Sequence, residues 1–79
     1  MKILYVSTTG AGDPTRASLA LHAAANGSVE VGDETAVVLM GDATELLDED
    51  TLRGVEGIGV PPVRDLMAKL LEHAVPVYV

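Results

Sequence analysis

The sequence has 79 residues, with 5 basic and 12 acidic side chains and a formal net charge of -7. A chain of this length forms one domain, and its acidic balance disfavours nucleic acid and anionic membranes as partners. The absence of cysteine, phenylalanine and tryptophan excludes a disulfide framework, a thiolate metal site and an aromatic flavin sandwich. No apolar run has the length of a membrane span or of a signal peptide, so we expect a cytoplasmic protein.

The chain begins with a predicted strand and a predicted helix. Lys2 to Ser7 (KILYVS) is a short apolar run of β-formers that ends in a glycine-containing loop, which is typical of a buried strand. Asp13 is a good N-cap and Pro14 suits the first helical position. We expect this helix to continue to about Val31, with a weak point at Gly27. One face of it carries Ala17, Ala20, Leu21 and Ala24.

The next segment predicts a second strand and a short helix. Glu34 to Met40 (ETAVVLM) is a continuous apolar run, which is typical of a parallel strand buried on both faces. Asp42 and Glu45 have the spacing of a capping box. We therefore expect a short helix that opens at Asp42, runs through Leu47 and ends at the acidic run 48–50.

A flexible loop, a helix and a third strand complete the predicted order. Gly54 to Val60 holds three glycines and reads as a flexible loop. Pro61 and Pro62 begin a helix, and Val75 to Val79 (VPVYV) is a third apolar strand whose proline is tolerable near its start. The helix has the clearest amphipathic pattern of the chain. Its apolar face contains Val63, Leu66, Met67, Leu70, Leu71 and Ala74.

The alternation of strands and helices predicts the fold and the position of a site. The order β-α-β-α-α-β predicts an α/β fold, a three-layer sandwich with a parallel sheet in a half-Rossmann arrangement. In such sheets ligands bind beyond the carboxyl ends of the strands. The candidate residues at this edge are Ser7, Thr8, Thr9, Gly10, Gly12, Asp13, Gly41 and Asp42.

The loop VSTTGAGDPTRA resembles a phosphate-binding loop in its small residues and glycines. Such loops present free N–H groups and the positive end of a helix dipole to an anion. Here Asp13 places a carboxylate at that position and Pro14 removes one donor. Thr15 stands where the dinucleotide fingerprint has glycine or alanine, and Gly12 where the flavodoxin loop has its last hydroxyl. A strand-to-helix turn with an Asp-Pro cap is the stronger interpretation, and we expect no cofactor.

Other chemically active side chains give no stronger candidate. His22 and His73 lack a neighbouring nucleophile in the sequence, and His73 suits a helix C-terminus. The hydroxyls of Ser7, Thr8 and Thr9 have no assignable base, and hydrogen bonding within their own loop is the ordinary expectation. The acidic residues fit no calcium loop, so we expect a solvated surface and no metal site. These acids are Asp42, Glu45, Asp48, Glu49 and Asp50.

Four short motifs follow one another along the chain. The first is D-P-x-R-A, Asp13 to Ala17, after a strand and a small-residue loop. G-D-E, Gly32 to Glu34, precedes the second strand and G-D, Gly41 and Asp42, follows it. The last is A-V-P-V-Y-V, Ala74 to Val79. In this order and at compatible spacing, the four motifs resemble the DsrE family of small sulfur-relay proteins, which includes the DsrE/DsrF and TusD-type subunits.

The resemblance implies an α/β sandwich that forms homo-oligomers or hetero-oligomers, and a cysteine that carries sulfur as a persulfide. In many members that cysteine follows directly after the strand that Val75 to Val79 resembles. We therefore expect residues 1–79 to be a single DsrE-like domain without its C-terminal part, and no catalytic residue can be assigned. The first hypothesis is a sulfur-relay subunit whose cysteine is not in this chain. A cysteine-free structural or regulatory subunit, and a nucleotide- or flavin-binding module using residues 7–13, stay open.

Overall fold

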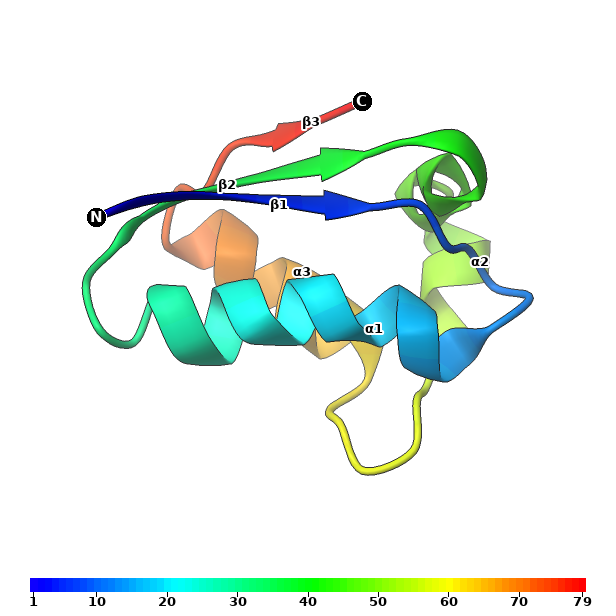
Figure 1. Cartoon of the computed structure of the whole chain (residues 1–79). Helices are drawn as coiled ribbons and strands as arrows, with labels where there is room; N and C mark the ends of the chain where they lie inside the picture. The colour runs from blue at the N-terminus through cyan, green and yellow to red at the C-terminus, as the bar shows by residue number, and fades with distance from the viewer.

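A computed structural model describes all 79 residues and shows a three-stranded parallel sheet with helices packed beneath it (Figure 1). The strands are β1 (Lys2–Ser7), β2 (Glu34–Leu39) and β3 (Val77–Tyr78), in the order β1-β2-β3. In the register, Leu4 lies opposite Ala36 and Val37 lies opposite Val77. The predicted α/β class and the parallel sheet are confirmed.

The helical elements follow the predicted order with one unpredicted addition, α2, and the third strand is shorter than predicted. The short strand β3 is two residues long, shorter than the predicted range Val75 to Val79, because the chain leaves the last helix through Ala74 in the left-handed region (φ 56°) and only then turns into the sheet. The helices are α1 (Pro14–Ala23), the π-helical turn η1 (Ala24–Ser28), the 3₁₀ helix η2 (Gly41–Leu47), α2 (Glu49–Arg53) and α3 (Val63–Glu72).

Both long helices lie on the same face of the sheet (Figure 1). Strands placed in the order β1-β2-β3 move across the sheet in one direction, so two connections of the same hand bring α1 and α3 to one side. A layer on the other side needs a reversal of that direction, which residues 1–79 do not contain. Of the expected three-layer sandwich, these residues therefore form two layers, one of helices and one of sheet.

The side chains of the strands alternate between a covered face and an open face. On the covered face, beneath which the helices pack, Ser7, Thr35, Val37 and Leu39 are buried. On the open face, Leu4 is 59% exposed. The prediction that β2 is buried on both faces is therefore wrong, because no helix lies over its even-numbered residues. The open face carries Lys2, Leu4, Val6, Glu34, Ala36, Val38, Met40 and Tyr78.

The core lies between the covered face and the two long helices. Leu21 of α1, Leu39 of β2 and Leu70 of α3 are all fully buried, and each such side chain contributes about 1.5–3 kcal/mol when it is removed from water. The small residues predicted for α1 let it approach the sheet closely. The remaining core side chains are Ala17, Ala24, Ala25, Val37, Ala43, Leu46, Val55, Val63, Leu66, Met67 and Val75.

The first helix ends close to its predicted limit. Its helical turns continue through η1 to Ser28, past the expected weak point at Gly27, and Gly32 then turns the chain with a φ of 79°. The Ser28 hydroxyl is hydrogen-bonded to the phenol of Tyr5 on β1. This bond between η1 and the sheet holds the last helical turn in place.

The predicted capping box is wrong, whereas the predicted end of the short helix at the acidic run is confirmed, since η2 ends at Leu47 and Asp48 is extended. The 3₁₀ helix η2 begins after Met40, whose carbonyl accepts from Ala43 N–H at 3.1 Å, and no side chain caps it. Glu45 bonds elsewhere, as described below. The sequence did not predict that a second short helix, α2, begins within this run, where Asp48 caps it by accepting from the backbone N–H of Thr51 at 3.3 Å.

Two further details differ from the sequence-based expectations. Leu71, placed on the apolar face of α3, is 65% exposed, and Ala74 lies outside the helix and is exposed. The glycine-rich loop expected to be flexible is anchored, since Ile58 N–H donates to Thr15 Oγ1 at 3.0 Å. Gly57 packs against the N-terminal turn of α1, where a Cβ atom would lie 2.8 Å from Thr15 Cα.

Candidate functional site

The structure brings the loops after β1 and β2 together at the carboxyl edge of the sheet, as predicted. The backbone N–H of Met40 donates to the Ser7 carbonyl at 2.9 Å, which continues the β1–β2 pairing into the loops. Gly41 then takes a φ of 56°, which favours glycine and turns the chain into η2. All eight candidate residues therefore belong to two adjoining segments.

Gly10 is the contact point between the two segments. It is buried, and a Cβ atom at this position would collide with the Asp42 carbonyl oxygen and with the Glu45 carboxylate. That carboxylate also accepts a hydrogen bond from Ala11 N–H at 3.1 Å. Glu45 is thus a residue of this edge that the sequence pattern missed, because its partner lies 34 residues away in the chain.

A second carboxylate occupies the start of α1. Asp13 accepts from Arg16 N–H at 3.2 Å as the predicted N-cap, and its other oxygen lies 3.5 Å from Arg16 Nε. An anion-binding loop needs such N–H groups to be free. Here Glu45 and Asp13 use the N–H groups of Ala11 and Arg16, so the arrangement weighs against phosphate binding by this loop.

The hydroxyl groups of the edge differ in exposure. Ser7 is buried, Thr9 is half-buried and Thr8 is exposed to solvent. None of the three makes the expected side-chain hydrogen bond within its own loop. The threonine that does so is Thr44, whose hydroxyl donates to the Gly41 carbonyl at 2.8 Å. The exposed Thr8 hydroxyl is therefore available to a partner.

Neither histidine is brought to this edge. His22 Nδ1 is hydrogen-bonded to Asn26 Nδ2 at 3.1 Å, along the surface of α1 and η1. His73 lies at the opposite edge of the sheet, where α3 ends. No nucleophile with a neighbouring base is formed by the hydroxyls of Ser7, Thr8 and Thr9. The structure contains no group of three or more His, Cys, Asp or Glu side chains suited to a metal ion.

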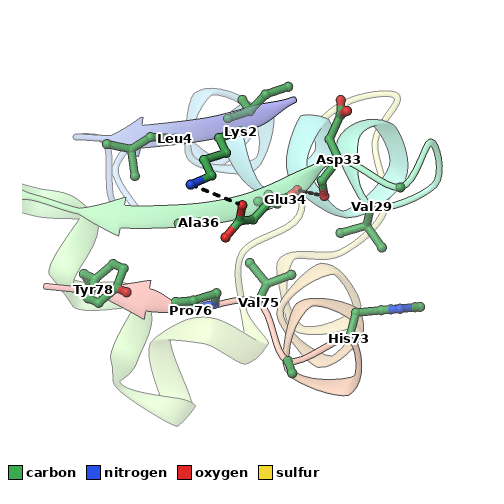
Figure 2. Close-up of a pocket in the computed structure, with 14 residues that line it drawn as sticks. Lys2, Leu4, Val29, Asp33, Glu34, Ala36, His73, Val75, Pro76 and Tyr78 are labelled. Carbon is green, nitrogen blue, oxygen red and sulfur yellow. Dashed lines mark hydrogen bonds and ion pairs between the residues drawn. The ribbon is translucent and has the colours of Figure 1, made fainter.

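A cavity of about 650 Å³ lies at the amino edge and extends over part of the open face (Figure 2). Leu4, Ala36 and Tyr78 line it from three neighbouring strands, and Lys2 pairs with Glu34 at 3.8 Å (Figure 2). Sequence reasoning did not select this region, because it looks for function at the carboxyl ends of strands. No sequence signal marks it, because Ile3 to Val6 is a continuous apolar run that does not show which side chains are exposed.

One carboxyl group has a clearly shifted pKa. The Lys69 ammonium donates a hydrogen bond to Glu30 and lowers the pKa of that carboxyl below its ordinary value of 4.5, and the charge of the same ammonium adds to the effect. Lys69 also donates to Asn26 Oδ1 at 2.7 Å. These bonds join α3 to η1 at the surface and are distant from the carboxyl edge.

The chain belongs to the DsrE/DsrF-like family, whose sequence pattern matches residues 1–79. The family resemblance inferred from the four motifs is confirmed. Comparisons with curated proteins and with solved structures gave no match. No helix has both the length and the apolar character that crossing a membrane requires.

Proposed function

We propose that this protein is a subunit of a sulfur-relay assembly of the DsrE/DsrF type, in which residues 1–79 supply the scaffold and one edge of the transfer site. The observation that carries the proposal is the family match over residues 1–79 in a chain without cysteine. The contact between the two loops at the carboxyl edge supports it, because α/β proteins bind their ligands beyond the carboxyl ends of parallel strands.

Sulfur relay sets a clear requirement for the chemistry. An acceptor thiolate attacks the terminal sulfur of a donor persulfide, forms a new sulfur–sulfur bond and releases the donor as its thiolate. Both reactants are thiols or their persulfides. Because residues 1–79 contain no thiol, the group that carries the sulfur lies outside them under this proposal, and these residues position and shield it.

The electrostatics of the edge fit a positioning role. Asp13 and Glu45 place two carboxylates there, Asp42 adds an exposed acidic residue to the adjoining loop, and Arg16 offsets the charge of Asp13. Nearby negative charge disfavours a thiolate, so the edge does not itself activate a thiol. Together with the net charge of -7, it favours docking of a protein with a basic surface, which would bring the reacting sulfur with it.

A sulfur-loading experiment tests the proposal. The protein is purified together with its partners, loaded with polysulfide as the sulfur donor, and each component is weighed by intact mass spectrometry. We expect a component bound to this protein to gain sulfur that thiol alkylation blocks. If neither the protein nor anything that copurifies with it gains sulfur, the sulfur-relay role is contradicted.

Matched variants connect the result to the edge. Asp42→Asn and Thr8→Val change exposed side chains of the carboxyl edge, and we expect them to slow sulfur transfer several-fold. Glu72→Gln removes a carboxylate that is equally exposed on α3 and should leave the rate unchanged. Equal effects of Asp42→Asn and Glu72→Gln, with none for the uncharged change Thr8→Val, would show that net charge, and not this edge, governs the transfer.

The absence of cysteine from all 79 residues also favours a second candidate, a structural or regulatory subunit that carries no sulfur. Intact mass after alkylation separates the two. A protein from its native source that has a mass of 8.2 kDa and takes up no alkylating reagent is this second type. A larger mass with one reactive thiol supports sulfur transfer by the protein itself.

The third hypothesis, nucleotide or flavin binding by residues 7–13, has a direct test in thermal shift. A ligand at 100 times its Kd adds about 2.7 kcal/mol to the free energy of unfolding. Because Glu45 and Asp13 already occupy the loop donors, we expect no shift with flavin mononucleotide, nucleotides or inorganic phosphate. A clear shift with any of them would support ligand binding instead.

A further inference from the structure

We propose that Asn26 is a modification site, at which the Asn26–Gly27 pair deamidates to aspartate or isoaspartate at a rate set by the opening of η1. The pair lies within η1, the π-helical turn that continues α1. Asn26 carries the only side-chain amide of residues 1–79, which contain no glutamine and no other asparagine. The inference is independent of sulfur transfer, because η1 is distant from the carboxyl edge.

The reaction needs only the chain itself and water. The backbone nitrogen of Gly27 attacks the side-chain carbonyl carbon Cγ of Asn26, so that a new carbon–nitrogen bond forms and the bond from Cγ to Nδ2 breaks. The proton of the Gly27 N–H leaves with Nδ2 as ammonia, and a cyclic imide remains. Water then opens the imide at one of its two carbonyls, which gives aspartate or isoaspartate. Glycine favours this attack, since it has no Cβ beside the nitrogen and its backbone rotates freely.

The first argument is that the pair is accessible and lies in a weak part of the helix. Asn26 is exposed and Gly27 is half-buried, and a Cβ atom at Gly27 would meet nothing within 4 Å. The backbone hydrogen bond from Val29 N–H reaches five residues back to the Ala24 carbonyl at 3.0 Å, a spacing that is rare in helices. Glycine in a helix lowers its stability further. Such segments open locally more often than the core does.

The second argument is that the Asn26 amide is bound at both of its polar atoms. The Lys69 ammonium donates to Asn26 Oδ1 at 2.7 Å. Asn26 Nδ2 is hydrogen-bonded to His22 Nδ1 at 3.1 Å. Because lysine has donors only, it fixes which side of the amide carries the oxygen. The amide therefore joins α1 to α3 and is held in one orientation.

The third argument is that the closed turn keeps the reacting atoms apart. Residues 24–28 are helical, and the flanking Val29 also has helical backbone angles, with φ -62° and ψ -42°. In a helical backbone the nitrogen of the next residue points away from the side-chain carbonyl carbon. Ring closure therefore requires the backbone at Asn26 to leave the helix and the bonds to Lys69 and His22 to break. The fold thus slows the reaction for as long as η1 is closed.

Deamidation would weaken the surface contact of α3 with η1. Aspartate at position 26 adds one negative charge to a chain with a net charge of -7, and it competes with Glu30 for the ammonium of Lys69. Isoaspartate adds a methylene group to the main chain, which the helical hydrogen bonds of η1 do not accommodate. The next turn includes Ser28, whose hydroxyl is bonded to Tyr5 of β1. The modified chain should therefore unfold at a lower urea concentration.

The direct test is to incubate the full chain in a mildly alkaline buffer and to follow it by anion exchange and intact mass spectrometry. We expect a product with one more negative charge and a mass about one dalton higher. Because Asn26 is the only side-chain amide present, the product is assigned without mapping. The same chain in concentrated urea should convert at least tenfold faster. Equal rates in buffer and urea would show that η1 does not restrain Asn26, and no product from the folded chain would show that Asn26 is not modified; either result overturns the proposal.

A glycine pair tests the attacking nitrogen. Gly27→Ala adds a methyl group that has open space and suits a helix, and it should slow the reaction at least tenfold in buffer and in urea. Gly12→Ala also meets open space and is the matched control, which should leave both rates unchanged. An undiminished rate in Gly27→Ala would contradict attack by this nitrogen.

A lysine pair tests the opening of η1. Lys69→Met removes the donor to Asn26 Oδ1 and should speed the reaction several-fold in the folded chain, with no change in urea. Lys2→Met, which removes the exposed partner of Glu34 on the sheet, is the control and should have no effect. Hydrogen exchange of the Gly27 and Ser28 amides should be faster in Lys69→Met, which measures the opening itself. A slower or unchanged reaction in folded Lys69→Met would show that Lys69 does not protect the site, and would contradict the proposed control of the rate.

Discussion

The two faces of the sheet share the same three strands and differ in almost everything else. On the covered face, Val37 and Leu39 of β2 have no exposed surface, and the helices fill every position beneath them. On the open face, Leu4 and Val6 of β1 are more than half exposed. The contrast arises from topology, since strands in the order β1-β2-β3 send both crossovers to one side. Residues 1–79 therefore cover one face of the sheet and leave the other exposed.

The largest expected effect is a loss of stability on truncating a leucine of the covered face, compared with a leucine of the open face. Leu39→Ala opens a cavity in the core and should lower the free energy of unfolding by about 2–5 kcal/mol. Leu4→Ala on the open face should cost less than about 1 kcal/mol when the chain is dilute, because most of that side chain already meets water. Urea denaturation at low protein concentration measures both. Equal losses would mean that the open face is covered in the isolated chain.

The comparison extends to the glycines of the carboxyl edge. Gly10→Ala should destabilise the chain by about 1–3 kcal/mol, because the added methyl group meets the Asp42 carbonyl and Glu45. Gly12→Ala, two residues further along, meets open space and should change stability little. Thermal unfolding of the two variants gives the comparison. A neutral Gly10→Ala would show that the two loops are not in contact.

Much of the covered side was predictable from the sequence. The apolar spacing of α3 and the Asp-Pro start of α1 depend on residues within a few positions of each other. The start of α1 is confirmed, and the apolar face of α3 is confirmed except at Leu71 and Ala74. The contact of Glu45 with Ala11 was not predictable, because local spacing offered Asp42 as a nearer partner. The exposure of one face of β2 was not predicted. An apolar run indicates that a strand can be buried, but it does not show whether helices pack on both of its faces.

Loss of a helix cap should lower the free energy of unfolding less than a cavity in the core does. Asp13→Ala removes the acceptor for Arg16 N–H and should cost about 1 kcal/mol. Asp42→Ala should lower stability much less, because the Asp42 side chain does not cap η2. Chemical denaturation of the two variants compares them. A larger loss of stability for Asp42→Ala would indicate that Asp42 does cap η2, which would contradict the structure.

The smallest expected effect is a pH dependence at the surface. Lys69 lowers the pKa of Glu30 in the folded chain, so this carboxyl stabilises the fold above its unfolded pKa and loses that contribution as the pH falls through the lower folded value. The effect is small because Glu30 is exposed. In Lys69→Met the pKa of Glu30 should rise, as carboxyl NMR titration would show. An unchanged titration would mean that the ion pair does not form.

The central claim is that one face of the sheet is completed by this chain and the other is open. The most direct test is the alkylation rate of two adjacent single cysteines in the dilute protein. Ser7→Cys replaces a side chain on the covered face that is 5% exposed, and Val6→Cys replaces one on the open face that is 51% exposed. We expect the thiol at position 6 to react at least tenfold faster than the thiol at position 7. Similar slow rates at both positions would show that the chain covers both faces, and would contradict it.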